Sequence, residues 1–242
     1  MKKVSVVIPA RYASTRFPGK VIANLAGKPI IQWVYEKAIA AKNIDDVYIA
    51  VDDAKVAKVV ESFGGKYIMT KPEHPSGTDR IWEAAESLDA DIIINVQGDE
   101  PLIPTEVIEE LAEKMRADFS LEMGTVAVPV KRKEVENNPN AVKVIFDNAN
   151  IAIYFSRSII PYLREGGDDM TVYKHWGIYA YKKDVLKQLV SFPESNLEKC
   201  EKLEQLRALE NGVKIYVITS NLESIGIDTP EDLIEAEKKV NS

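Results

Sequence analysis

Three cationic side chains follow the first apolar run of this chain. The run from Val4 to Ile8 predicts a buried strand, and Arg11, Arg16 and Lys20 then fall within ten residues of one another. In open α/β sheets, ligands bind beyond the carboxyl ends of the strands. In a chain of net charge −7, this density of cations at a strand end predicts an anion-binding site. The alternative is a solvated loop near the edge of the domain.

The predicted anion site lacks the standard phosphate-binding loops. Neither G-x-x-x-x-G-K-[ST] nor G-x-G-x-x-G occurs in the sequence, so no motif is present whose backbone amides would cradle a phosphate. Side chains must therefore supply most of the contacts. Arg offers a planar fork to phosphate oxygens and Lys a compact charge, and this combination suits a flexible polyphosphate.

Two carboxylates could complement that site by holding a metal ion. Asp99 directly follows 91–97, the most apolar predicted strand, and Asp228 precedes a predicted helix start at Thr229. Helix capping accounts for Thr229 and its neighbours, but it leaves Asp228 without a structural duty. Two carboxylates and a polyphosphate are a usual set for Mg²⁺-assisted transfer. The alternative makes Asp99 a turn residue before a proline.

Three further segments carry polar residues with two possible explanations each. Gly77 and Thr78 would let a flat base approach and Arg80 would add charge, but the Ser76 cap of a helix explains the same segment equally well. His175 and Tyr179 share one face of a predicted strand, where a core histidine is the commoner fate. Glu204 and Gln205 lie on a predicted amphipathic helix, where they would ordinarily face solvent.

Composition sets the outer limits of the interpretation. The chain has 242 residues, of which 45% are hydrophobic and 29% charged, which suits one compact domain spanning residues 1–242. The net charge argues against nucleic-acid or membrane-surface binding. One cysteine, Cys200, and two histidines exclude a disulfide framework and a Cys/His metal cluster. No apolar run reaches the length of a membrane span, so we expect a cytoplasmic protein.

The order of predicted elements indicates an α/β fold. Strands and helices alternate through the first half, which favours a doubly wound, mostly parallel, three-layer plan. Strand signals then cluster at about 125–185 and predict an antiparallel insertion that could wall a substrate pocket or pair two subunits. The predicted strands are 4–9, 46–51, 66–69, 91–97, 124–130, 141–146, 151–154, 172–181 and 214–218; the predicted helices are 30–41, 54–63, 77–88, 105–116, 183–190, 198–210 and one from 230.

Five motifs, in order and together spanning nearly the whole chain, resemble the CMP-Kdo synthetases, the 3-deoxy-manno-octulosonate cytidylyltransferases. They are residues 9–20, 74–80, 95–101, 175–181 and 226–233. One departure is Trp176, where many members carry Leu. This residue need not contact the pocket. Sialic acid cytidylyltransferases look similar at the start, but they typically have Asn where this chain has Val21.

The resemblance implies a Rossmann-like nucleotidyltransferase fold and a homodimer that uses the insertion. It implies transfer of CMP from CTP to 3-deoxy-D-manno-octulosonate (Kdo), with Mg²⁺ and release of diphosphate, which activates the sugar for lipopolysaccharide synthesis. By resemblance, Arg11 and Lys20 contact the triphosphate, with Arg16 less certain, and Asp99 and Asp228 bind the metal. The implied cytosine pocket comprises Pro9, Ala10, Ser76, Gly77, Thr78 and Arg80; the implied sugar ligands are Gln97, Arg157, His175, Tyr179, Glu204 and Gln205.

The implied reaction is in-line attack by the sugar hydroxyl on the α-phosphorus, so positioning and electrostatics would supply most of the catalysis. Neither a protein nucleophile nor a single obvious general base is expected. Three other functions remain open: a non-catalytic nucleotide-binding protein, another cytidylyltransferase, and a glycosyltransferase with a related core. The presence of both Asp99 and Asp228 argues against the first. The absence of a D-x-D motif at 98–100 argues against the last.

Overall fold

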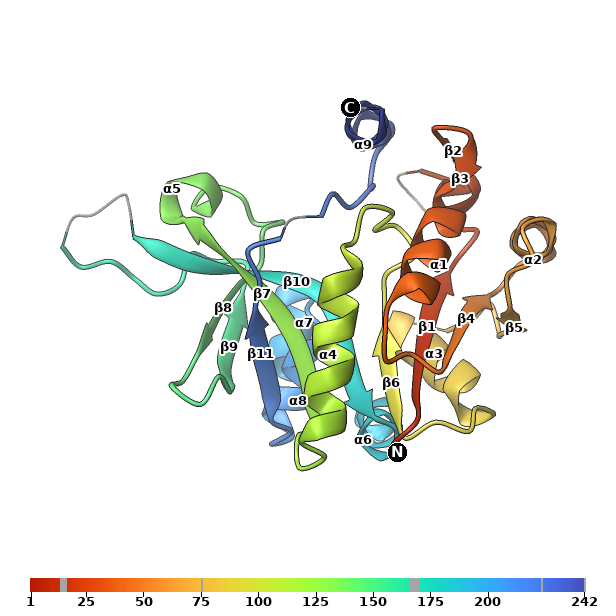
Figure 1. Cartoon of the computed structure of the whole chain (residues 1–242). Helices are drawn as coiled ribbons and strands as arrows, with labels where there is room; N and C mark the ends of the chain where they lie inside the picture. The colour runs from red at the N-terminus through yellow and green to blue at the C-terminus, as the bar shows by residue number, and fades with distance from the viewer. Residues whose placement is uncertain (14–16, 75, 166–169, 223, 242) are drawn as a thin grey trace.

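The computed structural model describes residues 1–13, 17–74, 76–165, 170–222 and 224–241. Strands and helices alternate through the first half, as the sequence predicts (Figure 1). That half comprises β1 (Val4–Ala10), η1 (Lys20–Ile22), β2 (Asn24–Leu25), β3 (Lys28–Pro29), α1 (Ile30–Ala40), β4 (Asp46–Val51), α2 (Ala54–Ser62), β5 (Tyr67–Met69), α3 (Gly77–Glu86), β6 (Ile92–Asn95) and α4 (Thr105–Ala117).

The second half is richer in strands. It comprises β7 (Met123–Lys131), α5 (Arg132–Val135), β8 (Lys143–Phe146), β9 (Ala152–Ser156), β10 (Thr171–Lys182), α6 (Lys183–Ser191), α7 (Asn196–Glu201), α8 (Gln205–Glu210), β11 (Ile215–Thr219) and α9 (Pro230–Val240). None of the helices within the described residues is long and apolar enough to cross a membrane.

Nine of the described strands form one mixed sheet. Its main path runs β11-β7-β10-β6-β1-β4-β5, and β8 and β9 extend it beside β10. The pairs among β6, β1, β4 and β5 are parallel, whereas β10 is antiparallel to both β6 and β7. The predicted fold class, a mostly parallel sheet with an antiparallel insertion, is therefore confirmed. The assignment of the chain to a single domain stays a prediction.

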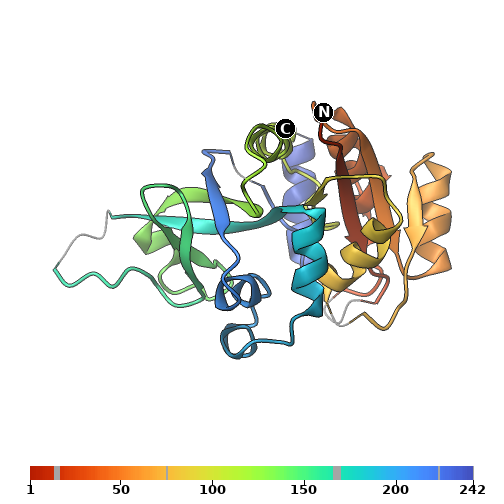
Figure 2. The same cartoon turned by 90° about the horizontal axis from the view of Figure 1, so that it is seen from below.

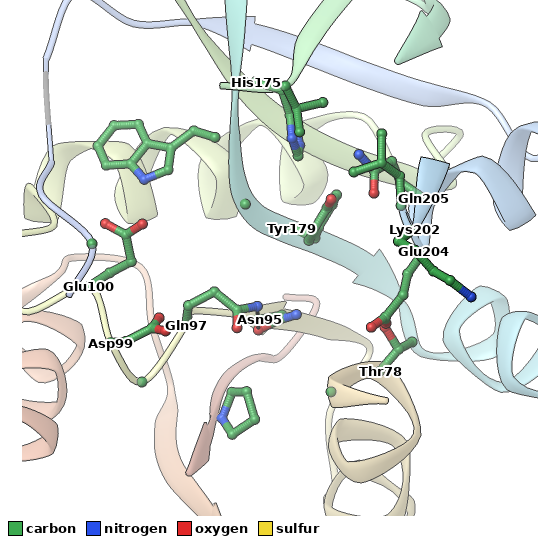
Figure 3. A pocket seen from close by; sticks show the side chains of 18 of the residues that line it. Thr78, Asn95, Gln97, Asp99, Glu100, His175, Tyr179, Lys202, Glu204 and Gln205 are labelled. Atoms are coloured by element: carbon green, nitrogen blue, oxygen red, sulfur yellow. Dashed lines mark hydrogen bonds between the residues drawn. The ribbon is translucent and has the colours of Figure 1, made fainter. Parts of the chain in front are cut away.

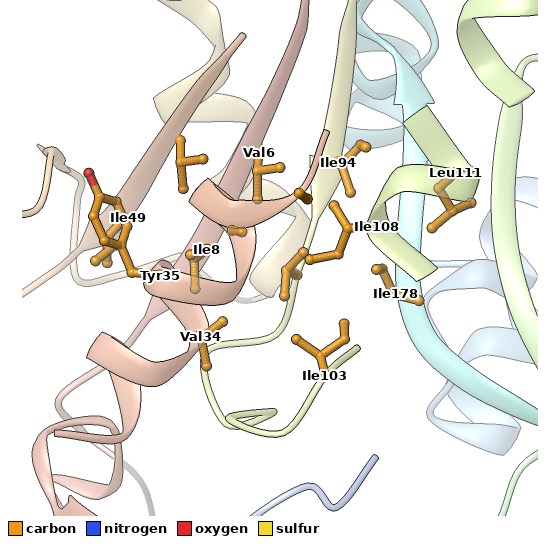
Figure 4. Packing of buried hydrophobic residues seen from close by; sticks show 14 of the residues in the cluster. Val6, Ile8, Val34, Tyr35, Ile49, Ile94, Ile103, Ile108, Leu111 and Ile178 are labelled. Carbon is orange, nitrogen blue, oxygen red and sulfur yellow. The ribbon is translucent and has the colours of Figure 1, made fainter. Parts of the chain in front are cut away.

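Two apolar cores cover the two faces of the sheet. Alternate strand residues such as Val6 and Ile8 face α1, α2 and α4, while Val7 faces α3, α6 and α8. Figure 4 shows the first core, with Val34 of α1 and Ile108 of α4 packed against strand residues. Because side chains alternate across a strand, a continuous apolar strand can fill both layers. This three-layer arrangement places the carboxyl ends of β1 and β6 side by side.

The insertion lies on the side of the molecule away from β4 and β5 (Figures 1 and 2). Its long strand β10 is irregular: Trp176 pairs with Val126, but the next pair is Tyr179 with Thr125. Two residues of β10 are therefore unmatched on β7, and this bulge redirects the strand where it enters the centre of the sheet. The simple alternation predicted for 172–181 is wrong at this point.

The helix predicted at 198–210 is two short helices. Helix α7 ends at Glu201. Its C-cap, Lys202, has a φ of 53° in the left-handed region, and α8 then begins at Gln205. The apolar pattern continues across the break, so periodicity alone gave one helix. The left-handed residue turns the chain and ends the first helix, as such residues commonly do.

Candidate active site

A cavity of about 1010 Å³ opens beyond the carboxyl ends of β1 and β6. Its walls come from residues 9–13 and 20–21, the start of α3, the loop after β6, the β10 bulge, and the chain around α8 and Asp228. In Figure 3, Gln97 and Asp99 lie on the opposite side of the cavity from His175 and Gln205. Ligand pockets commonly measure about 300–1,000 Å³, so this one has room for a nucleotide and a second substrate.

Lys20, Asp99 and Asp228 meet at one point of the cavity wall. The Lys20 Nζ atom lies 2.6 Å from Asp99 Oδ2 and 3.0 Å from Asp228 Oδ1. Desolvation by burial by itself would lower the pKa of Lys20, but the two carboxylates outweigh it and raise the pKa above its ordinary value. The ammonium therefore stays charged. Residues separated by as many as 208 positions thus form one cluster.

Two glycines allow this convergence. Gly19 has a φ of 72°, a left-handed conformation that places Lys20 at the start of η1, and its amide bonds Tyr12 O at 3.0 Å. A Cβ on Gly98 would lie only 2.6 Å from Pro9 O. Glycine at 98 therefore lets the loop that carries Asp99 approach the end of β1.

Asp228 is held in place by two hydrogen bonds, one from its own backbone amide and one from the amide of the preceding residue. The Ile227 amide donates to Asp99 O at 2.8 Å, and the Asp228 amide donates to Asp232 Oδ2 at 2.9 Å. The predicted cap of the last helix is confirmed, since Thr229 and Asp232 form a reciprocal capping box at the start of α9. The Ile227 side chain is fully buried, which anchors Asp228 at the cavity.

The donor set of this cluster fits a hard divalent cation. Both carboxylates reach one nitrogen atom, so a compact cation could contact both. Mg²⁺ commonly takes one or two protein carboxylates and fills its other positions with water and substrate phosphate. Among the described residues there is no group of three or more His, Cys, Asp or Glu side chains that could form a complete metal cage.

The expected nucleotide ligands are distributed unevenly around the cavity. Pro9, Arg11, Gly77 and Thr78 line it, and Arg11 makes no hydrogen bond or ion pair with any described residue, so its guanidinium is available to an anion. The Ala10 side chain is buried in the core, and Ser76 caps α3 through Asp79. Arg16 lies outside the described residues.

Arg80 is not at the edge of the pocket, where it was expected. Its side chain is fully buried, donates from Nη1 to Thr70 Oγ1 at 2.6 Å, and lies 3.2 Å from Asp52 Oδ2. Asp52 also accepts from the Tyr12 amide at 2.9 Å. Arg80 therefore supports the base of the cationic loop through Asp52. Helical spacing cannot reveal this role, because Asp52 follows a different strand.

Most of the expected sugar ligands gather on the wall formed by β10 and the chain around α8, which we call the second wall. Gln97 faces them from the first wall, formed by the loops after β1 and β6 and the start of α3. Gln97, His175, Tyr179, Glu204 and Gln205 all line the cavity. Thr78 donates to Glu204 and so joins the two walls. Gln205 is buried, contrary to the expectation for its helix face, and its Nε2 has no hydrogen-bond partner among the described residues. A buried, unpaired amide is costly, so a ligand that accepts from it would relieve that cost.

His175 and Tyr179 are uncharged groups in this wall. Burial lowers the pKa of His175 to about 3 and raises the pKa of Tyr179 well above its ordinary value. Their ring centroids lie 5.4 Å apart. Near neutral pH both side chains therefore offer hydrogen bonds without charge.

Arg157 lines the cavity but already supports the backbone around it. Its Nε donates to Glu201 O at 2.6 Å, and its two terminal nitrogens donate to Pro139 O and Lys202 O. Two of its five N–H donors remain for a ligand. Arg157 therefore fixes the turn between α7 and α8 as well as facing the cavity.

Sequence reasoning missed several residues of this site. Lys174 and Lys202 add positive charge to the second wall, and Asn95 and Glu100 add polar groups. Burial raises the pKa of Glu100, although hydrogen bonds from Ser224 and Trp176 oppose that shift. Trp176 also lines the cavity, which corrects the expectation that it would not need to. The 95–101 and 175–181 motifs contain Asn95, Glu100 and Trp176, but no motif signalled Lys174 or Lys202.

The comparisons with known proteins agree over nearly the whole chain. The profile of the Cytidylyltransferase family matches residues 5–215. The 3-deoxy-manno-octulosonate cytidylyltransferase of Thermodesulfovibrio yellowstonii is 51% identical, with 98% of this chain and 97% of that protein aligned. The same enzyme of Trichlorobacter lovleyi is 46% identical, with 98% of each chain aligned.

A solved structure gives the same result. The structure of CMP:2-keto-3-deoxy-manno-octonic acid synthetase complexed with CTP is 42% identical to this chain and superposes with a TM-score of 0.95. The match covers 99% of this chain and 98% of that one. With the family profile, the sequence relatives and this structural match in agreement, the chain belongs to the 3-deoxy-manno-octulosonate cytidylyltransferase family of nucleotidyltransferases.

Proposed function

We propose that this protein transfers CMP from CTP to the anomeric hydroxyl of Kdo, which forms CMP-Kdo and releases diphosphate. The observation that carries the proposal is the convergence of Lys20, Asp99 and Asp228 at the wall of a two-substrate cavity. A protein that only binds a nucleotide seldom needs both carboxylates at the reacting end. The product would serve lipopolysaccharide synthesis, as the family name implies.

In this proposal the first wall holds the nucleotide. Arg11, which has no partner among the described residues, binds the triphosphate, and Lys20 turns from its carboxylates toward the phosphates that become diphosphate. Gly77 and Thr78 face the base. Positive charge placed where negative charge develops stabilises the transition state.

The second wall holds the sugar acid. His175, Tyr179 and Gln205, with Gln97 facing them from the first wall, offer uncharged hydrogen bonds to hydroxyl groups. Arg157, Lys174 and Lys202 provide positive charge for the carboxylate. Holding the two substrates in line replaces a bimolecular encounter by an intramolecular one. No protein nucleophile is required for direct transfer to the hydroxyl.

A divalent cation such as Mg²⁺ belongs to the proposal. Asp99 and Asp228 would hold it, and its charge would offset that of the phosphates during transfer. Support comes from the oxygen-only donor pair and its fit to a cation. Loss of diphosphate release on chelation, with recovery on adding Mg²⁺, tests this assignment.

We also propose that the protein is a cytoplasmic homodimer. The insertion exposes Ile153 at 58% and Tyr162 at 85%, and exposed apolar side chains can mark an interface. Sedimentation equilibrium that found only the mass of one chain would contradict the dimer. Cell fractionation tests the location.

One assay tests the reaction. Purified protein is incubated with CTP, Mg²⁺ and either Kdo, sialic acid or a phosphosugar, and diphosphate is measured. We expect rapid release with Kdo and little with the other two acceptors. Release with a phosphosugar alone would favour another cytidylyltransferase activity, and no release with any acceptor, despite CTP binding, would favour a nucleotide-binding protein.

A further inference from the structure

Thr125 lies behind the second wall of the cavity, and its hydroxyl contacts three groups of β10. It is a fully buried residue of β7, opposite Tyr179 at the β10 bulge. Its Oγ1 lies 3.0 Å from His175 Nε2, 2.8 Å from Ile178 O and 3.3 Å from Trp176 O. Because of the bulge, two carbonyls and the imidazole of one strand reach a single hydroxyl of its neighbour.

The hydrogens in this cluster can be assigned by counting. Carbonyl oxygens only accept, and Thr125 Oγ1 carries one hydrogen, which it donates to the nearer carbonyl, that of Ile178. The lone pairs of Oγ1 are then available to accept a hydrogen from His175 Nε2. In the opposite arrangement, Oγ1 would donate to the ring and face both carbonyls without a hydrogen between them, which is repulsive.

The second ring nitrogen of His175 is left open. A neutral imidazole has one N–H, so protonation of Nε2 leaves Nδ1 as an acceptor. Nδ1 has no hydrogen-bond partner among the described residues, and His175 lines the cavity (Figure 3). Phe155 at 4.9 Å and Tyr179 at 5.4 Å, measured between ring centroids, hold the ring on two sides.

We propose that Thr125 is a positioning residue that holds His175 as the Nε2–H tautomer, so that Nδ1 accepts a hydrogen bond from a hydroxyl of the sugar-acid substrate. This inference rests on the proposed function for the identity of that substrate. The tautomer also determines which substrate group can bind at Nδ1. A hydroxyl satisfies Nδ1, whereas a carboxylate or carbonyl oxygen placed there would meet a lone pair.

The tautomer can be measured directly in the wild-type protein. The chain has two histidines, so ¹⁵N-histidine labelling gives two sets of ring signals, and His74→Gln assigns them. At pH 7 we expect the long-range ¹H–¹⁵N pattern of a neutral ring protonated at Nε2 for His175. Protonation at Nδ1 in the wild-type protein would overturn the proposal, whatever the enzyme activity.

Two variants test the role of the Thr125 hydroxyl. Thr125→Val keeps the shape and removes the hydroxyl; we expect a mixture of tautomers and a rise of about fivefold to tenfold in the KM for Kdo, the cost of one hydrogen bond. The KM for CTP should stay within about twofold. Thr125→Ser should restore both readouts, and Thr171→Val, an exposed threonine of β10, should leave them unchanged.

The outcomes separate the possible failures. An unchanged tautomer and an unchanged KM for Kdo in Thr125→Val would overturn the proposal, as would equal rises in both KM values with the tautomer intact. If Thr125→Val does not fold, the wild-type spectrum and the Thr125→Ser variant still decide. Failure of the wild-type protein to use Kdo would refute the proposed substrate, while the spectrum would still report on Thr125 and His175.

Discussion

At the scale of single residues, the sequence showed which charged side chains follow the strands, but it did not show which residues they contact. Arg11, Lys20, Asp99 and Asp228 could be selected from the sequence because their charges follow predicted strands or precede a helix cap, and all four line the cavity. Arg80 had an equally suggestive position, yet it pairs with Asp52 in the interior. The difference lies in tertiary contacts between distant segments, which residue spacing does not encode.

Lys20 gives a prediction at this scale. In Lys20→Met the triphosphate loses a charged contact, and we expect kcat/KM for CTP to fall by roughly tenfold to a hundredfold, since hydrogen bonds to charged groups contribute about 1.5–3 kcal/mol. Removal of the ammonium also removes a positive charge that contacts both Asp99 and Asp228 and would compete with a cation there. Binding of Mn²⁺ alone, measured by electron paramagnetic resonance, should therefore become tighter.

The control for Lys20 is Lys58→Met, which removes an exposed lysine of α2. It should change neither kcat/KM nor Mn²⁺ binding. Weaker Mn²⁺ binding in Lys20→Met would show that the lysine does not compete with a cation for the two carboxylates. An unchanged kcat/KM for CTP would exclude Lys20 from the triphosphate site.

At the scale of elements, the sequence predicted which segments are helices and strands better than how they are shaped. Continuous apolar runs identified β1 and β6, and capping residues identified the start of α9. The bulge of β10 and the break at Lys202 were missed. Both occur where a hydrophobic pattern continues while the backbone departs from regular geometry, and both place side chains in the cavity.

Gly98 gives the prediction for an element. A Cβ at this position would lie 2.6 Å from the backbone oxygen of Pro9, so Gly98→Ala must push the loop after β6 away from β1 and displace Asp99. We expect a loss of about 1–3 kcal/mol in the free energy of unfolding, as for overpacking in a core, together with a lower kcat. Urea unfolding and the diphosphate assay measure the two effects.

Gly77→Ala is the matched control for stability. A Cβ on Gly77, the first residue of α3, would meet no atom within 4 Å, and alanine favours a helix. Its free energy of unfolding should be unchanged or slightly higher. Equal unfolding midpoints for Gly98→Ala and the wild-type protein would show that the loop can move without cost.

At the scale of the whole molecule, the site depends on docking of the C-terminal helix. Ala236 of α9, together with Ile227 just before the helix, packs against Leu25, Ile30 and Trp33, and Figure 1 shows α9 beside β2 and β3. This small apolar cluster brings Asp228, near the C-terminus, beside Lys20, near the N-terminus. The Asp99–Asp228 pair therefore exists only when the two ends of the chain are packed together.

Ile227 tests that dependence. Ile227→Ala leaves a cavity under α9 and should cost about 2–5 kcal/mol locally, so amide hydrogen exchange in α9 should accelerate and kcat/KM for CTP should fall. The control is Ile234→Ala, which truncates a side chain of α9 that is 56% exposed and should change neither. Full activity with faster exchange in Ile227→Ala would show that Asp228 is not needed in this position.

The sequence by itself determined the alternation of elements, the two apolar faces of the strands and the charged residues at the strand ends. These features are local, because side-chain periodicity, capping and charge depend on neighbours along the chain. The tertiary structure alone decided that Lys20 lies between Asp99 and Asp228, that Arg80 pairs with Asp52, and that Thr125 meets His175. Such pairings depend on close packing and on departures from regular backbone at Gly98 and the β10 bulge, which bring distant residues within hydrogen-bond distance.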